Sequence, residues 1–426
     1  MADKIKFVVF SLGCKVNQYE GSAMIEKLKE NGFDATDRLE YADYYIINTC
    51  SVTAEADKKS RQCVSRMLKF NKNAKIYVFG CSSENNSKQY LNKPNIVKIF
   101  GSFGKISALN SIMSDIVHPK NDQKIECLYP PVLEFEDDLT PELTKSRAYI
   151  KVQDGCNNFC SYCIIPYIRG RSRSRNLDSI VNEVRSIADK TKEIVITGIN
   201  VSDYGRNIGL TLVDLVKALG EFDLRKRFGS LECTVISDEL LLAMKEAGFC
   251  DSFHLSMQSG CDNVLKKMNR HYTASEFLQK IDLIRKYFPD AGITTDIIIG
   301  FPEETDDDFK QTLQTVERAG FLDMHVFPYS VRPGTRAAKM TQVDPQVTAS
   351  RVEKMKDVKQ SAIEKFIQSQ IGKHSRVFVE ENEGEYNVGH TSNFIKVYTH
   401  APIGSYINHE IKKYYKNGAI GEPENE

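Results

Sequence analysis

The sequence of 426 residues has no tryptophan, no excess of either charge and no long apolar run, and these absences exclude several classes of protein. Lys plus Arg and Asp plus Glu each number 57, so a histone-like, polybasic mode of nucleic-acid binding is excluded and any such binding must be local. No stretch approaches the roughly 18 apolar residues that cross a bilayer. The apolar run 7–10 is too short for a signal-peptide core. We therefore expect neither membrane insertion nor secretion.

Cysteine is also scarce, with 11 in the whole chain, and an odd number cannot pair completely within one molecule. This favours a reducing, cytoplasmic location over a disulfide-stabilised scaffold. Hydrophobic residues make up 41% and aromatic residues 10%, which is enough to form folded cores. At about 150 residues per domain, the length predicts two or three domains.

The first 120 residues alternate β-branched runs with amphipathic stretches, which is typical of parallel strands joined by crossover helices. We therefore expect an open parallel α/β sheet in a domain spanning 1–120. Segment 121–145 contains three prolines and an acidic run, which predicts a linker. The predicted strands are 5–11, 43–48 and 75–79, and the predicted helices are 18–31 and 55–69.

A second alternating series fills 146–345 and predicts a sheet that curls into a partial (β/α)6 barrel. A polar helix is expected at 346–371, followed by a small β-barrel at 372–426. The fold class is thus multidomain α/β with a terminal β module. The predicted strands of the second series are 148–153, 193–197, 230–235, 252–257, 292–298 and 322–327, and those of the last part are 376–380, 394–399 and 406–415.

The strongest motif is a CxxxCxxC spacing made by Cys156, Cys160 and Cys163, just after the first strand of the second series. Three thiolates within eight residues can hold three irons of a [4Fe–4S] cluster and leave the fourth iron open to a small molecule. Zinc is the alternative, but a structural zinc site needs a fourth ligand, and none is evident nearby.

Three further cysteines, Cys14, Cys50 and Cys81, each follow a predicted strand of the first domain. The carboxyl ends of parallel strands form one crevice, so these thiols are expected to converge as a second three-thiolate site. The alternative is that each is a small buried hydrophobe. The other five cysteines show no matching spacing and are interpreted as structural: Cys63, Cys127, Cys233, Cys250 and Cys261.

CxxxCxxC with Tyr162 before its last cysteine resembles the signature of radical S-adenosylmethionine (SAM) enzymes. GCKVNQYE at 13–20 and NTCSVT at 48–53 resemble the methylthiotransferases. Together with 55–62, GCKVNQYE looks most like the branch that acts on N6-threonylcarbamoyladenosine in tRNA. The C-terminal module resembles the TRAM domain, a small RNA-binding barrel, so that the resemblance covers nearly the whole chain.

The resemblance implies two [4Fe–4S] clusters, with SAM on the cluster of the CxxxCxxC loop and the other cluster carrying the sulfur. The expected product is 2-methylthio-N6-threonylcarbamoyladenosine, formed by radical chemistry at carbon 2 of the base next to the anticodon. The implied partners are tRNA, a low-potential electron donor such as a flavodoxin or ferredoxin, and a sulfur donor. We expect a monomer. Two alternatives are a methylthiotransferase acting on an aspartate of a small-subunit ribosomal protein and a non-enzymatic, zinc-bound RNA-binding protein.

Other segments match the family at the expected mouth of the barrel, where SAM and the base would meet. The chain departs from the family pattern at Gly229, at Cys261 and at the two serines after Cys81. The residues that the resemblance offers for cofactor binding are Tyr162, Gly198, Asn200, Glu232, Gln258 and Asp296.

Four arginines recur at every second position after the CxxxCxxC loop, with no acidic residue among them. In an extended segment this spacing places all four guanidinium groups on one face, which suits phosphate binding. We therefore interpret them as candidates for RNA binding, with 266–271 as a weaker basic candidate. The four are Arg169, Arg171, Arg173 and Arg175.

Overall fold

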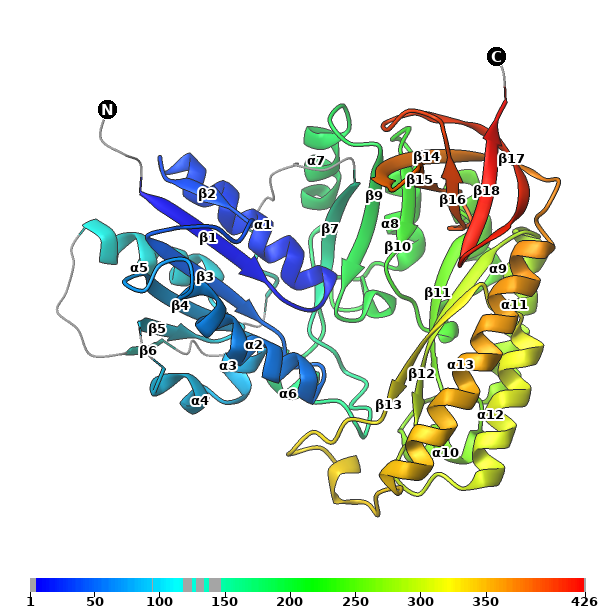
Figure 1. The fold of residues 1–426 in the computed structure, drawn as a ribbon, viewed down its shortest axis with the longest axis horizontal. Coiled ribbons are helices and arrows are strands. Elements are labelled where there is room, and N and C mark those ends of the chain that lie inside the picture. Colours follow the sequence, from blue (N-terminus) through cyan, green and yellow to red (C-terminus); the bar gives the residue numbers. More distant parts are fainter. Residues whose placement is uncertain (1–4, 94, 118–124, 128–133, 138–146, 425–426) are drawn as a thin grey trace.

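The computed structural model describes residues 5–93, 95–117, 125–127, 134–137 and 147–424. Its first part is a six-stranded parallel sheet with the order β2-β1-β3-β4-β5-β6, which confirms the predicted open α/β sheet (Figure 1). The strands are β1 (Lys6–Ser11), β2 (Asp34–Thr36), β3 (Tyr44–Thr49), β4 (Lys75–Gly80), β5 (Ile96–Phe100) and β6 (Ile125–Cys127).

Helices cover both faces of this sheet, since its central strands are apolar on both sides. Helices α1 and α5 pack on one face, and α2 and α4 pack on the other. Strand β6 lies within the segment that the sequence predicts as a linker, and most of that segment is outside the described residues. The helices are α1 (Lys15–Glu30), α2 (Ala54–Met67), α3 (Cys81–Asn85), α4 (Lys88–Leu91) and α5 (Lys105–Val117).

The second part is a partial barrel made of two sheets, with the orders β10-β9-β7-β8 and β11-β12-β13. Single bridges, such as that between Leu231 and Leu255, join the two sheets, and helices cover the outside (Figure 1). The strands are β7 (Arg147–Asp154), β8 (Arg173–Ser174), β9 (Glu193–Gly198), β10 (Arg225–Phe228), β11 (Ser252–Gln258), β12 (Gly292–Ile299) and β13 (Asp323–Pro328). The helices are α6 (Ile165–Arg169), α7 (Leu177–Ile187), α8 (Leu212–Leu219), α9 (Asp238–Glu246), α10 (Asp262–Lys267), α11 (Ala274–Tyr287) and α12 (Asp306–Ala319), with 3-10 turns at Val201–Asp203, Cys233–Val235 and Ala337–Lys339.

The predicted third strand of the barrel, 230–235, is wrong. The strand is β10, five residues earlier, and Cys233–Val235 forms a 3-10 turn. Arg225 and Arg227 made β10 look like a polar loop, but both side chains pair with the buried Glu193 of the neighbouring strand β9. Both arginines of β10 are therefore paired inside the fold with one carboxylate that is distant in sequence.

The last part is the long helix α13 (Pro345–Gln368) and a closed five-stranded barrel, which confirms the predicted β module. Helix α13 contributes Met355 to the core of the partial barrel and Ile363 and Ile367 to the core of the β-barrel, so it packs against both. Within the described residues, no helix is long and apolar enough to cross a bilayer. The barrel strands are β14 (His374–Glu383), β15 (Tyr386–His390), β16 (Lys396–Thr399), β17 (Tyr406–Tyr415) and β18 (Gly418–Pro423).

Candidate functional site

The structure brings Cys14, Cys50 and Cys81 together at one edge of the N-terminal sheet. Strands β1, β3 and β4 are neighbours, and their register pairs the last residues of each strand, so their carboxyl ends lie level. Cys50 and Cys81 directly follow β3 and β4, and Cys14 caps the start of α1. Burial, with smaller effects from Cys14 and Cys81, raises the pKa of the Cys50 thiol to about 12. We call these three residues the strand-end triad.

The loops that carry this triad are fixed by close packing and by buried amides. Gly13 has a φ of 88°, and a Cβ atom there would lie 2.3 Å from the sulfur of Cys50, so only glycine fits. The Asn17 side chain donates to the carbonyls of Leu12 at 2.8 Å and Thr49 at 3.0 Å. These contacts hold two of the three cysteine loops to each other through α1.

The second group, the loop triad, consists of Cys156, Cys160 and Cys163 on the loop after β7. Burial, and to a lesser degree the charges of Cys160 and Cys156, raise the pKa of the Cys163 thiol to about 12. The Asn269 side chain donates to the Asn158 carbonyl at 3.0 Å and holds the loop against the barrel rim. The pKa of the Cys156 thiol is also raised by burial, to about 11, so binding of iron by Cys156 and Cys163 at neutral pH must release protons.

A guanidinium group lies against one thiol of each triad. The Nε atom of Arg169 is 3.2 Å from the sulfur of Cys81, and the Nη1 atom of Arg270 is 3.5 Å from the sulfur of Cys160. Both arginines are buried, which contradicts the interpretation of Arg270 as part of a basic surface. A buried cation beside a sulfur favours its thiolate form and offsets the negative charge of a thiolate-ligated centre.

The three thiols of each triad are candidate ligands of a metal centre. Within the described parts of the chain, no three His, Cys, Asp or Glu side chains are grouped as ligands of one metal ion. In a [4Fe–4S] cluster each thiolate binds a different iron, so the sulfurs lie farther apart than around one zinc ion.

Two of the residues predicted to bind the cofactor lie beside the loop triad. The Nδ2 atom of Asn200 is 3.9 Å from the sulfur of Cys156. The carboxylate of Glu232 accepts from Asn158 at 2.5 Å and from Arg270 at 3.0 Å. Both side chains thus border the place where a molecule on the loop triad would sit, and their contact with SAM stays a prediction.

Of the other four predicted cofactor residues, Tyr162 lies in the loop itself, directly before Cys163, and the remaining three lie on barrel strands. Tyr162 packs edge-on against Phe301, with ring centroids 6.4 Å apart. Gly198 and Gln258 end β9 and β11 at the rim. Asp296 lies lower, three residues before the end of β12.

The Asp296 carboxylate contacts His254 at 3.2 Å and His325 at 3.3 Å. These histidines hold its pKa well below the usual range although burial opposes this. This ion pairing gives Asp296 a structural reason for its position, and a role in cofactor binding stays a prediction.

The predicted stripe of four exposed arginines is wrong. Arg169 ends α6 and Arg173 begins β8, with a left-handed Gly170 between them, so the segment is not one extended run. Arg169, Arg173 and Arg175 are only 1–2% exposed. Arg171 alone is exposed, with its guanidinium group 4.5 Å from the centre of the Phe159 ring.

The buried arginines face acidic groups that the local sequence does not contain. Arg173 pairs with Asp154 at 3.2 Å. Arg175 pairs with Glu183 and Asp137. Three of the four charges are therefore neutralised inside the fold and are not available to phosphate.

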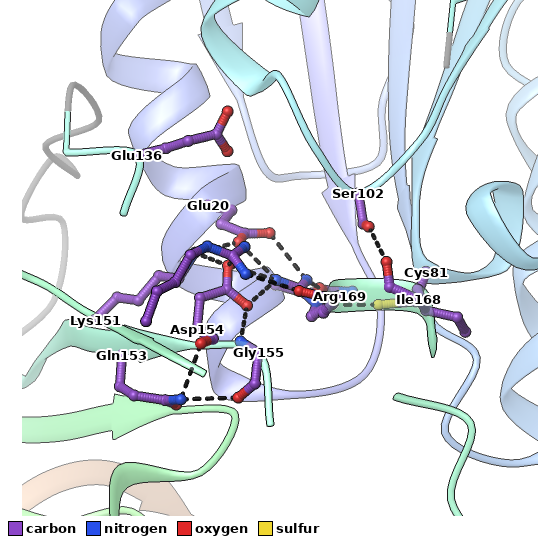
Figure 2. A network of polar contacts seen from close by, with 12 residues as sticks. Glu20, Cys81, Ser102, Glu136, Lys151, Gln153, Asp154, Gly155, Ile168 and Arg169 are labelled. Atoms are coloured by element: carbon purple, nitrogen blue, oxygen red, sulfur yellow. Dashed lines mark hydrogen bonds and ion pairs between the residues drawn. The ribbon is translucent and has the colours of Figure 1, made fainter. Parts of the chain in front are cut away.

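Arg169 is the centre of a buried network between α1 of the N-terminal sheet and β7 of the partial barrel (Figure 2). It pairs with Glu20 at 3.0 Å and Asp154 at 3.3 Å, and Lys151 contacts both carboxylates at 2.7 Å. Burial would raise the pKa of Glu20, but Arg169, Lys105 and Lys151 hold it well below the usual range. Sequence reasoning missed this network, although a glutamate on the apolar face of α1 was a signal for it.

A second polar contact joins the two parts at the rim of the sheet. Arg332 donates to Asp57 at 2.5 Å and to Ser51 at 2.6 Å, and all three side chains are buried. The backbone of Ala54 also donates to Ser330 at 3.0 Å. The strand-end triad is therefore held against the barrel from two sides.

The sequence matches two known families. Residues 150–316 match the radical SAM superfamily, and residues 6–101 match the uncharacterized protein family UPF0004. The chain is 35% identical to the threonylcarbamoyladenosine tRNA methylthiotransferase MtaB of Chlamydia pneumoniae, over 98% of this chain and 97% of that protein. It is 33% identical to the MtaB of Bacillus subtilis, over 95% of this chain and 93% of that protein. A tRNA-2-methylthio-N(6)-dimethylallyladenosine synthase of a Thermoanaerobacter species is 36% identical, over 80% of this chain and 75% of that protein.

Solved structures with low sequence identity share the fold. The radical SAM methyltransferase TsrM from Kitasatospora setae, solved with cobalamin and a [4Fe–4S] cluster, has a TM-score of 0.59 at 12% identity, over 79% of this chain and 74% of that chain. The cobalamin-dependent radical SAM enzyme OxsB has a TM-score of 0.53 at 10% identity, over 84% and 56%. This likeness extends the match in fold across the N-terminal sheet and the partial barrel.

Proposed function

The chain belongs to the threonylcarbamoyladenosine tRNA methylthiotransferase family, and we propose that it adds a methylthio group to carbon 2 of N6-threonylcarbamoyladenosine in tRNA. Membership of the radical SAM superfamily implies a [4Fe–4S] cluster and SAM. The second cluster, on the strand-end triad, is part of the proposal. We also propose a cytoplasmic location, which agrees with ten free thiols among the described cysteines.

The observation that carries the proposal is the closeness of the two triads. Cys81 packs against Ile164 and Ile168, and Ile164 directly follows Cys163. Methylthio transfer needs a sulfur source and a radical source that can reach the same base. Two thiol triads on facing domains, with Cys81 of one packed in the same cluster as the residue that follows Cys163 of the other, fit this requirement.

The residues present fit both clusters. Cys156, Cys160 and Cys163 would hold one, Cys14, Cys50 and Cys81 would hold the other, and three thiolates leave one iron of each without a protein ligand. When bound, the first cluster and SAM supply the radical chemistry that an unactivated aromatic carbon requires. Arg270 and Arg169 place a positive charge beside each triad.

Burial around the triads is the second contribution of the protein. Cys50, Cys81 and the neighbouring Ile164 and Ile168 are all buried, so apolar side chains shield this side of the strand-end triad from water, whereas the cysteines of the loop triad are half-buried. Exclusion of water protects a reactive intermediate from side reactions. No general base is needed for this chemistry, and we assign none.

The choice of base rests on the relatives. Five that are 33–37% identical act, by name, on threonylcarbamoyladenosine, and three that are 31–36% identical act, by name, on dimethylallyladenosine. The relatives named here all modify tRNA, which favours tRNA over an aspartate of a ribosomal protein. The electron donor, the sulfur donor and the monomeric state stay predictions.

We expect the chain to restore 2-methylthio-N6-threonylcarbamoyladenosine in a bacterium whose own gene for this modification is deleted. Mass spectrometry of digested tRNA should show the new nucleoside, a matching loss of its precursor and unchanged dimethylallyladenosine derivatives. The Cys156→Ala variant is the control and should give none. An unaltered nucleoside profile together with a modified ribosomal-protein aspartate would overturn the proposal.

Iron and sulfide analysis of the anaerobically purified protein separates the enzyme from the zinc-bound alternative. Two clusters require about eight irons per chain, whereas a zinc-bound RNA-binding protein has almost none.

Arg171 is the one member of the arginine group that can reach phosphate, so Arg171→Ala should weaken tRNA binding several-fold. The slope of log affinity against log salt should fall by about 1, because one phosphate contact is lost. Fluorescence anisotropy with labelled tRNA at several salt concentrations measures both quantities. Arg318→Ala, an exposed arginine near the end of α12, is the matched control. An unchanged slope in Arg171→Ala would remove Arg171 from the RNA interface.

A further inference from the structure

A cavity of about 470 Å³ opens where the three parts of the molecule meet. Lys15 of α1 lines it from the N-terminal sheet, Arg147 and Arg227 line it from the partial barrel, and Phe394 and Lys396 line it from the C-terminal barrel. Lys15 directly follows Cys14 of the strand-end triad. Through Lys15 the cavity reaches the strand-end triad. Arg147, Ser252 and Gly292 begin β7, β11 and β12, so the rest of its lining lies toward the amino ends of the barrel strands, at the end opposite the loop triad.

Positive charge predominates around this cavity. Arg147, Arg225 and Arg227 share the carboxylate of Glu193 at 2.6–3.2 Å, and Arg147 also pairs with Glu380 at 2.7 Å. Among the Lys, Arg, Asp and Glu residues that line the cavity itself, Lys15, Arg147, Arg227 and Lys396 are cationic, and only Asp323 is acidic. A buried surplus of charge is costly unless a ligand of opposite charge compensates it.

Two of these cations have donors to spare. Lys15 is half-buried, and among the described residues its ammonium group forms no hydrogen bond or ion pair. It lies over Gly229, where a Cβ atom would be only 3.6 Å from Nζ. Arg227 bonds Glu193 through Nε, and the face of its guanidinium group rests 4.0 Å from the centre of the Phe394 ring. This stacking fixes the guanidinium group and leaves its terminal nitrogens for a ligand.

We propose that Lys15 and Arg227 bind the carboxylate of the threonylcarbamoyl group and so select the base. In adenine, N1 alone separates carbon 2 from the carbon that bears N6, so the N6 substituent must lie next to the reacting position. The threonyl group ends in a carboxylate, whereas the dimethylallyl group of the related substrates is apolar and uncharged. A basic cavity favours the first and disfavours the second, because an apolar group would leave the cations uncompensated.

This inference rests on the proposed function and adds the residues that recognise the substrate. A phosphate of the tRNA backbone is the other anion that could enter the cavity. The two sources differ in one measurable way: loss of a phosphate contact weakens every tRNA equally, whereas loss of a carboxylate contact weakens only substrates that carry the carboxylate.

The test uses the reconstituted holoenzyme and two anticodon stem-loop RNAs, one with N6-threonylcarbamoyladenosine and one with its methyl ester. Wild-type kcat/KM should fall about ten- to hundred-fold on the ester, because a hydrogen bond to a charged group is lost. In Lys15→Met, kcat/KM on the acid RNA should fall by a similar factor, and kcat/KM on the ester RNA should change little. The preference for the acid RNA should therefore disappear. Lys15→Arg should retain most of it.

Lys15 adjoins Cys14, so its variants are checked for iron content. If Lys15→Met retains only about four of eight irons, the test passes to Arg227→Gln and Arg227→Lys on β10. For these variants too, kcat/KM on the acid RNA is compared with kcat/KM on the ester RNA. If kcat/KM fell equally on both RNAs in these variants, the carboxylate site would be overturned and a phosphate contact indicated. An active wild-type enzyme with no preference for the acid would also overturn it. A wild-type enzyme that modifies neither RNA, yet cleaves SAM, would overturn the proposed function and this inference with it.

Discussion

Replacing Cys50 with alanine should abolish methylthio transfer and leave reductive cleavage of SAM intact, whereas Cys156→Ala should abolish both. The two triads are separate in sequence and lie on different domains, so loss of one thiol should empty only its own site. The iron content should fall from about eight to about four per chain in either variant. Anaerobic assays of 5′-deoxyadenosine and of the modified nucleoside measure the two activities in the same sample.

Cys63→Ala is the matched control, because Cys63 is equally a buried cysteine of the N-terminal domain but packs among Val64 and Met67 in α2. It should retain about eight irons and both activities. If the Cys50 variant modified tRNA fully, the strand-end triad would have no role in sulfur transfer. If it lost SAM cleavage as well, the two sites would not be independent.

The convergence of these cysteines could be predicted because it depends on topology alone. Parallel strands that are adjacent in a sheet bring their carboxyl ends to one edge, and the sequence places a cysteine just after each of three strands. The loop triad was predictable for a simpler reason, since its spacing is local. Neither prediction needed any side-chain partner.

The arginine group could not be predicted in this way. Arg169, Arg173 and Arg175 look basic and exposed in the sequence because their partners lie elsewhere in the chain. Glu20 is 149 residues before Arg169, and only the packing of α1 on β7 brings them together. The same reason explains why the third barrel strand was predicted at the wrong residues. The arginines of β10 pair with Glu193 of β9, and this pairing cannot be seen in the local sequence. Local charge patterns fail where the compensating charge is distant.

Arg169→Met should destabilise the protein by about 3–5 kcal/mol, because it removes one partner from a buried ion network. Glu20 and Asp154 would stay buried with fewer cations around them (Figure 2). The variant would also lose the donor that lies 3.2 Å from the sulfur of Cys81. We therefore expect a lower thermal unfolding midpoint and a loss of iron from the strand-end triad, with methylthio transfer lost before SAM cleavage.

The loss of stability in Arg169→Met should depend on pH, and the direction of this dependence identifies its cause. In the wild-type protein the pKa of Glu20 is well below its usual range, so its contribution to stability is present above the unfolded pKa of about 4.3 and is lost only in strong acid. Without Arg169 only Lys105 and Lys151 oppose the effect of burial, and we expect burial to raise the pKa of Glu20 above its unfolded value. The variant should then lose stability as the pH rises, and the gap to wild type should be wider at pH 8 than at pH 5.

Two variants separate charge from packing at this position. Arg169→Lys keeps the charge but cannot donate at once to Glu20, Asp154, Asn17 and Cys81, so it should recover only part of the stability. Arg171→Met, two residues later, removes an exposed arginine and should change the midpoint by little. A deficit in Arg169→Met that is equal at pH 5 and pH 8 would point to lost packing alone. A variant that stays stable and retains about eight irons would show that the network does not hold the two cluster domains together.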